Sequence, residues 1–450
     1  MNIIHYTIGI PPFRHGGASK YALDLATEQC KTHNVSLLFP GDTLKLGNQS
    51  YFSSKKCVQE LAYYNIQNPV VSPLLFGIKD ANSILNHKKE FTTAVLERFH
   101  IETSPDIVHL HTLMGIPDSL IRFWKRKGVK IIFTSHDYYG ICTKVNLINE
   151  RSELCDGPGG LKCARCNHTS MDYWFLKLCN SSLFIKYKHL FPVKATYLKD
   201  DKEDLKEEQF FPSKSQVANF DLLIEYYKNI FSLIDCIHFN SAVAKEVYLK
   251  YYQVTKSYVV PITTNKIQDR RLSRVFNSNK IRLGFIGSIK YYKGFPMLKS
   301  VLKELLSSGI SNFTLDVWED GLDGIDKDCP FITFKGKYNN SQLKEVFSEM
   351  DLLIVPSVCK ETFSLVALEA LSFGTPVLVS ENVGAKNIIE NYDKQFVFSG
   401  KEGLKQILNK TSNSITILQE YNDRIITESW GHSVLQHSAK ITEIYSEIAK

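Results

Sequence analysis

The chain has 450 residues, of which 44% are hydrophobic and 12% aromatic, enough to fill two cores of about 200 residues each rather than one. Its formal net charge of +7 is too weak and too dispersed to indicate a nucleic-acid-binding protein, but it fits an anionic small-molecule substrate or an anionic membrane surface. The sequence begins without a basic and apolar leader, and no apolar stretch reaches the roughly 18 residues of a spanning helix. We therefore expect a cytoplasmic protein whose ten cysteines are reduced.

The first half of the chain alternates apolar strands with helices. A strand is predicted at Ile3–Thr7, followed by a loop with Gly16 and Gly17 and by a helix from about Ala18. Further strands are predicted at Val35–Phe39, Ile107–Leu110 and Val129–Thr134, with a helix at Ile116–Lys127. This alternation is typical of βαβ units around a parallel sheet.

The alternation stops between about Cys142 and Ser232, and we interpret residues 142–232 as an insertion on the first domain. Four cysteines with one Cys-x-x-Cys spacing lie in it: Cys142, Cys155, Cys163 and Cys166. Four thiols can form a tetrahedral zinc site that stabilises an otherwise loose segment. Alternatively, they are small buried hydrophobic residues, and the sequence leaves both interpretations open.

Within the insertion, the segment Asp172–Lys194 combines six aromatic residues with four lysines and one acid, and an acidic run follows at Asp200–Glu208. Aromatic rings and lysines together favour a membrane interface, where the rings lie at headgroup level and the ammonium groups meet anionic lipid. A pair of helices packed on the first domain, with the lysines in water, is the alternative. The first interpretation predicts peripheral contact with the inner face of the plasma membrane.

Strands resume after the insertion at Cys236–Phe239 and Ser257–Val260. The following stretch, residues 263–280, is polar with few large apolar side chains, and it is predicted to be a linker. The first domain is therefore expected to cover residues 1–262.

The second domain, residues 281–429, repeats the same alternation. It opens with a strand at Arg282–Gly287 and a helix that carries the leucines of Leu298–Leu306 on one face. Its further strands are predicted at Phe313–Trp318, Phe331–Phe334, Leu352–Pro356 and Pro376–Val379. The expected fold class is α/β, with two Rossmann-like doubly wound domains facing a central cleft.

The most informative motif follows the predicted strand Leu352–Pro356, where the chain reads from Lys360 to Ala370 as K-E-T-F-S-L-V-A-L-E-A. Glu369 is the only charged residue between Thr362 and Val379, on a helix that is apolar on every side, so it should be buried. A buried carboxylate needs hydrogen-bond partners, and ribose hydroxyls would serve. The helix start would offer N–H groups to a phosphate. An ordinary buried helix is the alternative.

Two glutamates with seven residues between them, in this setting, resemble the E-x7-E signature of family 4 of the retaining GT-B glycosyltransferases (glycosyl transferases group 1). The resemblance implies that Glu361 contacts hydroxyls of the donor sugar and that Glu369 binds the nucleotide ribose. Backbone N–H groups would contact the sugar and the diphosphate from Thr362, Phe363, Ser364 and Leu365.

The family also carries a strand ending in Gly-Arg, followed by Lys-Gly, whose cations hold the diphosphate. The segment Gly287–Gly294 resembles it, with Lys293 in the lysine position, but Ser288 stands where the arginine is expected. One phosphate cation is therefore missing or supplied by another residue, and Lys290 and Arg14 are the candidates.

In the first domain, the Gly16–Gly17 pair resembles the family's glycine loop near the donor or acceptor. His136, just after the strand Val129–Thr134, resembles the histidine that reaches the transferred sugar, whereas His109 and His111 fit packed strand residues. A helix at about residues 430–450 resembles the terminal helix that crosses back onto the first domain.

The resemblance implies a metal-independent hexosyltransferase that retains the anomeric configuration. It would move a sugar from a UDP- or GDP-sugar to a saccharide or lipid-linked acceptor, as in bacterial surface polysaccharide assembly, with no cofactor required for catalysis. Two alternatives stay open. Ser288 fits a catalytically silent GT-B partner subunit, and a GT-B nucleotide-sugar epimerase would share the two domains without an acceptor surface.

Overall fold

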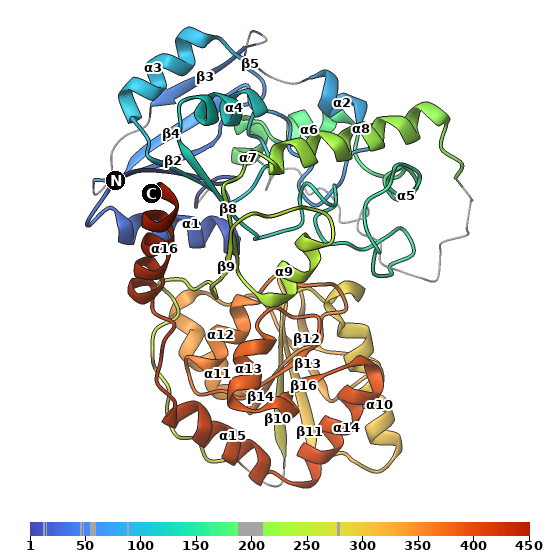
Figure 1. The fold of residues 1–450 in the computed structure, drawn as a ribbon. Helices are drawn as coiled ribbons and strands as arrows, with labels where there is room; N and C mark the ends of the chain where they lie inside the picture. Colours follow the sequence, from blue (N-terminus) through green and yellow to red (C-terminus); the bar gives the residue numbers. More distant parts are fainter. Residues whose placement is uncertain are drawn as a thin grey trace. The chain divides into compact units, whose positions relative to one another are not determined.

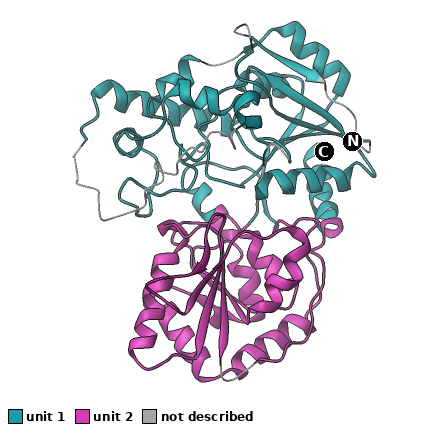
Figure 2. Ribbon diagram, turned by 180° about the vertical axis from the view of Figure 1, so that it is seen from behind, with its two compact units in different colours: residues 1–240, 245–260, 437–450 teal, residues 241–244, 261–436 magenta. Residues whose placement is uncertain are grey.

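The computed structural model of the protein describes residues 1–11, 14, 16–45, 47, 49–54, 60–87, 90–187, 210–276 and 280–450. The chain forms two compact units (Figure 2). Unit 1 comprises Met1–Asn240, Lys245–Val260 and His437–Lys450, and unit 2 comprises Ser241–Ala244 and Pro261–Gln436. The acidic run Asp200–Glu208 and residues 188–194 of the aromatic segment lie outside the described residues.

The predicted domain boundary at residue 262 lies two residues from the change of unit between Val260 and Pro261. The predicted linker groups with unit 2, and so do residues 430–436. The chain returns to unit 1 at His437, inside helix α16 (Val434–Ala449).

Unit 1 is built on a nine-stranded sheet of order β5-β3-β4-β2-β1-β6-β7-β8-β9 (Figure 1). Its parallel part comprises β1 (Asn2–Tyr6), β2 (Asn34–Pro40), β4 (Ala62–Gln67), β6 (Ile107–Leu110), β7 (Lys130–Thr134), β8 (Cys236–Phe239) and β9 (Ser257–Val259). The connecting helices include α1 (Gly17–Gln29), α3 (Thr93–Thr103), α4 (Asp118–Arg126) and α9 (Ala242–Leu249). Every residue of β6 and β8 is buried, as expected for parallel strands covered on both faces.

The sequence did not reveal the outer part of this sheet. There, β3 (Gln49–Ser54) pairs antiparallel with β4, and the short β5 (Glu90–Phe91) follows helix α2 (Asn82–Asn86). The sequences of β3 and β4, Q-S-Y-F-S-S and A-Y-Y-N-I-Q, mix polar and aromatic residues instead of forming apolar runs. Strands toward the edge of a sheet need less apolar surface, so their periodicity is weak.

The described part of the insertion contains the helices α5 (Gly160–Cys166), α6 (Tyr173–Cys179), α7 (Ser182–Tyr187) and α8 (Lys214–Phe231). Among its described residues, the only β-type pairing is an isolated bridge between Ile148 and Leu154. Helix α8 starts at a capping box formed by Ser213 and Gln216, which satisfies the free N–H groups of its first turn. Its buried face joins the hydrophobic core of unit 1, so the insertion is part of that unit.

Unit 2 contains a seven-stranded sheet of order β12-β13-β11-β10-β14-β15-β16, parallel apart from β12 (Figure 1). The strands are β10 (Ile281–Ile286), β11 (Phe313–Trp318), β12 (Asp323–Ile325), β13 (Ile332–Lys335), β14 (Leu352–Val355), β15 (Val377–Ser380) and β16 (Val397–Phe398). The helices are α10 (Phe295–Ser307), α11 (Leu343–Glu349), α12 (Leu365–Leu371), α13 (Lys386–Tyr392), α14 (Gly400–Asn413) and α15 (Thr416–Thr427). The predicted α/β class with two doubly wound parallel sheets is confirmed.

Helix α16 belongs to unit 1 through its last three turns. Ile441, Ile444 and Tyr445 are buried, and Tyr445 hydrogen-bonds His109 on β6. No helix among the described residues has both the length and the apolar composition to cross a bilayer.

Candidate active site

The lysine of the Lys293–Gly294 pair is held beside the end of β14 by a close backbone approach. Lys293 ends a short 3₁₀ turn, Tyr291–Lys293, and Gly294 follows with φ +78°. A Cβ at position 294 would lie 1.8 Å from the carbonyl oxygen of Pro356. Only glycine fits there, and this contact fixes the lysine at the carboxyl end of two adjacent strands, β10 and β14.

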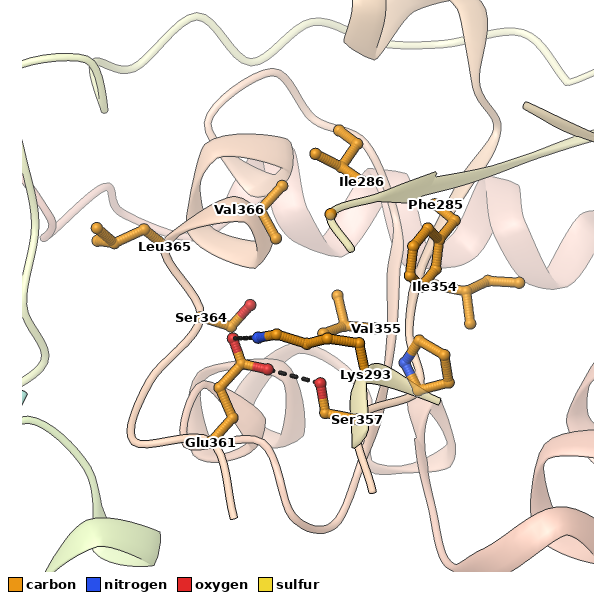
Figure 3. Close-up of a pocket in the computed structure, with 12 residues that line it drawn as sticks. Phe285, Ile286, Lys293, Ile354, Val355, Ser357, Glu361, Ser364, Leu365 and Val366 are labelled. Carbon is orange, nitrogen blue, oxygen red and sulfur yellow. Dashed lines mark hydrogen bonds and ion pairs between the residues drawn. The ribbon is translucent and has the colours of Figure 1, made fainter. Parts of the chain in front are cut away.

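Lys293 forms an ion pair with Glu361 in this position (Figure 3). The Lys293 Nζ atom lies 3.1 Å from Glu361 Oε1, and Ser357 Oγ donates a 2.6 Å hydrogen bond to Glu361 Oε2. Both carboxylate oxygens therefore have a donor. This satisfies the requirement that a buried charge be paired and hydrogen-bonded.

The pair fixes the charge of both groups. Burial would lower the pKa of Lys293, but the Glu361 carboxylate outweighs burial and raises the pKa of Lys293 to about 12. Burial would likewise raise the pKa of Glu361, but the charge of Lys293 and the hydrogen bond from Ser357 lower it below its ordinary value. At neutral pH the site therefore presents an ammonium group and a carboxylate.

The loop after Glu361 is anchored through its carbonyl groups. Gly384 N–H donates to Glu361 O, Ala385 N–H donates to Phe363 O, and Ser241 Oγ donates to Thr362 O. A Cβ at position 384 would lie 2.1 Å from the Thr362 carbonyl oxygen, so the approach again requires glycine.

Ser364, which precedes helix α12, has φ +93° and ψ +86°. A non-glycine residue adopts such a conformation at an energetic cost, and residues of this kind concentrate at functional sites. Ser364 and Leu365 both line the cavity described next. The strained turn thus places the start of α12 at that cavity.

The cavity, of about 210 Å³, lies at the carboxyl ends of β10 and β14 (Figure 3). It is lined by Phe285, Ile286, Gly287, Lys293, Ile354, Val355, Pro356, Ser357, Glu361, Ser364, Leu365 and Val366. Ligands of open α/β sheets bind in this position. Among the described residues that line it, Lys293 is the only cation and Glu361 the only anion.

Glu369 lies on α12 and is partly buried. Within the described part of the chain, its carboxylate forms neither a hydrogen bond nor an ion pair. Burial raises the pKa of Glu369 to about 7, although the charge of Lys266 opposes this shift. The same carboxylate contributes, after burial, to the raised pKa of Tyr338. A carboxylate of this kind is suited to accept hydrogen bonds from a ligand.

The structure brings only some of the predicted site residues together. Lys293, Glu361, Ser364 and Leu365 line one cavity, whereas Thr362, Phe363, Glu369 and Ser288 belong to unit 2 but do not line it. Gly16, Gly17 and His136 belong to unit 1. Sequence reasoning missed Ser357 and Gly384, because neither belongs to a spacing pattern that sets it apart from an ordinary loop residue.

The two candidate substitutes for the missing arginine lie outside this cavity. Arg14 belongs to unit 1, where its side chain is close to Gly9 and where burial lowers its pKa. Lys290 is close enough to Glu319 to moderate the rise that burial causes in the pKa of that carboxyl. Neither residue lines the cavity of Lys293.

The four cysteines of the insertion are partly buried free thiols. Burial raises the pKa of Cys163 to about 12 and that of Cys166 to about 11, and charge on the neighbouring thiols adds to both shifts. In the described ranges, the group whose ligand atoms all lie within 4.8 Å of one another is His5, His109 and His111, not the cysteines. Zinc at Cys142, Cys155, Cys163 and Cys166 stays a prediction.

Solved structures with the same architecture define the fold. HepE of Anabaena, solved in complex with UDP and glucose, aligns over 99% of both chains with a TM-score of 0.55 and 13% identity. WaaG, a glycosyltransferase involved in lipopolysaccharide biosynthesis, aligns over 99% of both chains with a TM-score of 0.53 and 15% identity. At this identity the likeness concerns the fold alone, which is the GT-B fold of glycosyltransferases.

Two family models match this chain, one in each unit. Residues 267–429 match the family Glycosyl transferases group 1, and residues 15–154 match Glycosyltransferase Family 4. The chain therefore combines domains of these two glycosyltransferase families. An uncharacterised glycosyltransferase of Methanocaldococcus jannaschii is 32% identical over 132 residues, which is 28% of this chain and 33% of the relative. The matched region thus spans about a third of that relative's length.

We predict that Lys293→Ala and Glu361→Gln each lower turnover by about 10²–10³-fold, the loss expected for one positioned electrostatic group. Lys293→Ala also leaves the Glu361 carboxylate buried without its cation. The measurement is steady-state release of nucleotide diphosphate from UDP- and GDP-sugars.

Lys299→Ala is the matched control, because Lys299 forms a comparable 2.7 Å ion pair with Asp326 in the same unit but does not line the cavity. Turnover near the wild-type level in both site variants would contradict the assignment of this cavity as the active site.

We predict that Glu369→Gln raises the unfolding temperature at pH 8. The folded-state pKa of Glu369, about 7, exceeds the ordinary value of 4.5, so the folded protein binds the extra proton as the pH falls below 7. The unpaired charge therefore destabilises the fold above pH 7, and this effect disappears toward pH 4.5. For a unit of this size, each 1 kcal/mol corresponds to about 2–4 °C.

Unfolding temperatures of the wild type and of Glu369→Gln, measured between pH 4.5 and 8.5, test this expectation. Glu345→Gln is the control, because Glu345 is exposed on α11. A Glu369→Gln variant that is less stable than the wild type at pH 8 would show that the carboxylate has a stabilising partner.

Proposed function

We propose that this protein is a retaining glycosyltransferase that moves a sugar from a UDP- or GDP-sugar to a saccharide or lipid-linked acceptor. The observation that carries the proposal is the combination, in one unit, of a buried ammonium–carboxylate pair at a cavity and a second carboxylate that has neither a hydrogen bond nor an ion pair to any described residue. The region that matches the family Glycosyl transferases group 1, residues 267–429, includes all three residues: Lys293, Glu361 and Glu369.

Glu369 supplies the nucleotide contact in this proposal. Its carboxylate can accept two hydrogen bonds from the hydroxyls of a ribose, and the described residues leave that capacity unused. Ionised Glu369 is the form that accepts both, so its hydroxyl partners also stabilise the charge that burial disfavours.

Lys293 and Glu361 act on the other end of the donor. Glu361 is already ionised and held by two donors, so its remaining lone pairs can accept hydrogen bonds from sugar hydroxyls. The Lys293 ammonium has three N–H groups, of which one is directed to Glu361. The others can donate to the diphosphate and stabilise the charge that develops on it as the sugar leaves.

We also propose that transfer is metal-independent, because the Lys293 ammonium group provides a positive charge at the cavity. Because the pKa of Lys293 is raised to about 12, the cation is present throughout the working pH range. A positioned ammonium group supplies the charge stabilisation for which other transferases use a divalent ion. The family resemblance supports the proposal that the anomeric configuration is retained.

The compared proteins support the substrate class. HepE was solved with UDP and glucose, and WaaG is involved in lipopolysaccharide biosynthesis. We therefore propose a hexosyl donor and a role in bacterial surface polysaccharide assembly.

One observation favours a second candidate, a catalytically silent partner subunit. Ser288 stands in the position of a phosphate-binding arginine, and Lys293 is the single cation among the described residues that line the cavity. A silent subunit would bind the nucleotide without turnover.

We expect sugar transfer, with release of nucleotide diphosphate, to continue in EDTA without added divalent metal. The test is a coupled assay with UDP- and GDP-sugars and a panel of saccharide acceptors. Loss of activity in EDTA that Mg²⁺ or Mn²⁺ restores would overturn the metal-independent mechanism. Nucleotide binding without any product release would identify the silent subunit, and isomerisation of the donor without acceptor would identify an epimerase.

We also propose that helices α6 and α7 hold the protein at the inner, anionic face of the plasma membrane. Leu176 of α6 is buried in the core of unit 1, whereas Trp174 of α6 and Leu183 of α7 are 67% and 62% exposed. Lys177 lies 5.1 Å from the centre of the Trp174 ring, and Lys186 lies 5.1 Å from that of Tyr187. Exposed rings with ammonium groups beside them match the chemistry of an anionic lipid surface.

The variant Lys177→Gln/Lys186→Gln should bind vesicles of anionic phospholipid less tightly, since each lysine contributes about 1 kcal/mol near such a surface. Flotation at low and at high salt measures this. The control is Lys303→Gln/Lys440→Gln, which removes two exposed lysines from α10 and α16. Equal flotation of both variants, or no flotation of the wild type, would contradict membrane docking and leave the transferase proposal unaffected.

A further inference from the structure

Four cysteines of the insertion take no part in the transferase chemistry proposed above. This cysteine cluster comprises Cys142 after strand β7, Cys155 in the loop before helix α5, and Cys163 and Cys166 on that helix. All four are partly exposed free thiols. Cys236 on β8, in contrast, is 1% exposed and lies within the sheet, as expected for a cysteine that only fills space in a core. Packing alone therefore does not account for the cluster.

A short hairpin brings Cys155 to helix α5. The bridge between Ile148 and Leu154 closes the hairpin, and Cys155 N–H donates a 2.7 Å hydrogen bond to Leu147 O. The hairpin also contacts α5, where Cys166 Sγ lies 3.8 Å from the carbonyl oxygen of Ile148. Because these two carbonyl groups belong to consecutive residues, the hairpin places Cys155 near Cys166.

The other two cysteines meet at a small hollow beside helix α8. Cys142 and Cys163 both line a cavity of about 10 Å³, together with apolar side chains such as Phe220 and Leu223. Cys163 and Cys166 are three residues apart on α5, so they face the same side of that helix. Helix α5 thus joins the contact made by Cys142 to the contact made by Cys155, and the four thiols form one group.

Electrostatics shows the same proximity. Burial raises the pKa of Cys155, Cys163 and Cys166, and charge on Cys142 raises the pKa of each of them further. Cys142 therefore lies within electrostatic reach of the three other sulfur atoms. Four thiolates packed this closely repel one another unless a cation lies between them.

Two backbone amides are directed at sulfur atoms of the cluster. Gly157 N–H donates to Cys155 Sγ over 3.4 Å, and Gly159 N–H donates to Cys163 Sγ over 3.5 Å. Each of these bonds opposes the rise that burial causes in the pKa of its thiol. A neutral thiol is a weak acceptor, whereas an anionic sulfur gains more from an N–H donor. The amides thus suit metal-bound thiolates, which such outer partners orient.

The loop that carries these amides is fixed by contacts that do not involve the thiols. Gly157 has φ +131°, a conformation that favours glycine. Before it, the Tyr251 hydroxyl donates a 2.8 Å hydrogen bond to Asp156 O. After it, Gly160 N–H donates over 2.8 Å to the carboxylate of Asp221 on α8. The two amide donors are therefore held in place by the fold itself.

We propose that the cysteine cluster binds one structural zinc ion through four thiolates. Four sulfur ligands around a tetrahedral ion, with no position left for a substrate, are typical of structural zinc. Each thiol releases its proton to water as its sulfur binds. The ion joins the loop after β7 to helix α5, so it stabilises the insertion and is not a catalytic group. This inference does not depend on the transferase function.

Binding requires a contraction of the cluster. The four sulfur atoms do not all lie within 4.8 Å of one another, whereas four Zn–S bonds of about 2.3 Å in a tetrahedron set them about 3.8 Å apart. Cys142 and Cys155 lie in loops, so these two side chains can approach the ion while α5 stays in place.

Elemental analysis and cobalt spectroscopy of the wild type test the proposal. Protein made without a polyhistidine tag, and purified in reducing buffer without chelator, should contain one zinc ion per chain. Exchange for Co²⁺ should give the sulfur-to-cobalt charge-transfer bands and the visible absorption of a tetrahedral four-thiolate site. Protein without stoichiometric zinc, or a cobalt spectrum without sulfur ligands, would overturn the proposal.

Cys163→Ala should lose the zinc ion and the cobalt spectrum. Cys236→Ala is the matched control, because Cys236 is a buried thiol of unit 1 outside the cluster. If the cluster only fills space, the two variants have the same metal content, which would contradict the proposal. If Cys163→Ala does not fold, titration of the wild type with an organomercurial decides. Zinc should be released as four thiols react, and a reaction without zinc release would contradict the site.

Removal of the ion separates this site from the metal-independent transfer proposed above. A strong chelator that extracts the zinc should lower the unfolding temperature, because the binding free energy of a structural metal contributes to folding. Activity lost in this way should return with Zn²⁺ and not with Mg²⁺ or Mn²⁺. An unchanged unfolding temperature after verified zinc removal would refute the structural role. A wild type without transferase activity would refute the proposed function, and its zinc content would still decide this inference.

Discussion

The ion pair between Lys293 and Glu361 is the constraint around which unit 2 is arranged. Two opposite charges are stable away from water only if they are close and if their remaining donors and acceptors are satisfied. The fold meets this condition with two close backbone approaches, Gly294 on Pro356 and Gly384 on Thr362. Without them the lysine and the carboxylate, which come from different loops, would not lie 3.1 Å apart.

The two units differ in how far their buried polar groups are hydrogen-bonded. Unit 2 leaves the Glu369 carboxylate without a partner in the described structure and holds Ser364 in a strained conformation, features that reduce stability and are typical of a site prepared for a ligand. Unit 1 satisfies both ring nitrogens of four buried histidines, His5, His109, His111 and His238, with hydrogen bonds. A satisfied network of this kind is rigid.

The C-terminal helix contributes to unit 1 more than packing. Tyr445 on α16 hydrogen-bonds His109 on β6, and the amide nitrogen of Gln29 on α1 donates to Thr442 on α16, so the last turns of the chain are tied to both the sheet and the first helix of unit 1. An apolar residue of the same size in place of Tyr445 would fill the space but would leave a buried ring nitrogen of His109 without this hydrogen bond.

The sequence by itself determined the alternation of strands and helices, because buried parallel strands such as β14 and β15 are continuous apolar runs. It also singled out Glu361, Glu369 and Lys293, since a lone charge in an apolar helix and an E-x7-E spacing are local patterns. It missed β3 and β4, whose mixed composition has no clear period.

Only the tertiary structure decided which groups meet. The bond of Ser357 to Glu361 depends on how the loop after β14 turns, and the bond of Tyr445 to His109 joins residues 336 positions apart. Neither substitute for the missing arginine lines the cavity, although both are plausible along the chain. Hydrogen bonds act over about 3 Å, and distances of that size between remote residues are set by packing, which local periodicity does not encode.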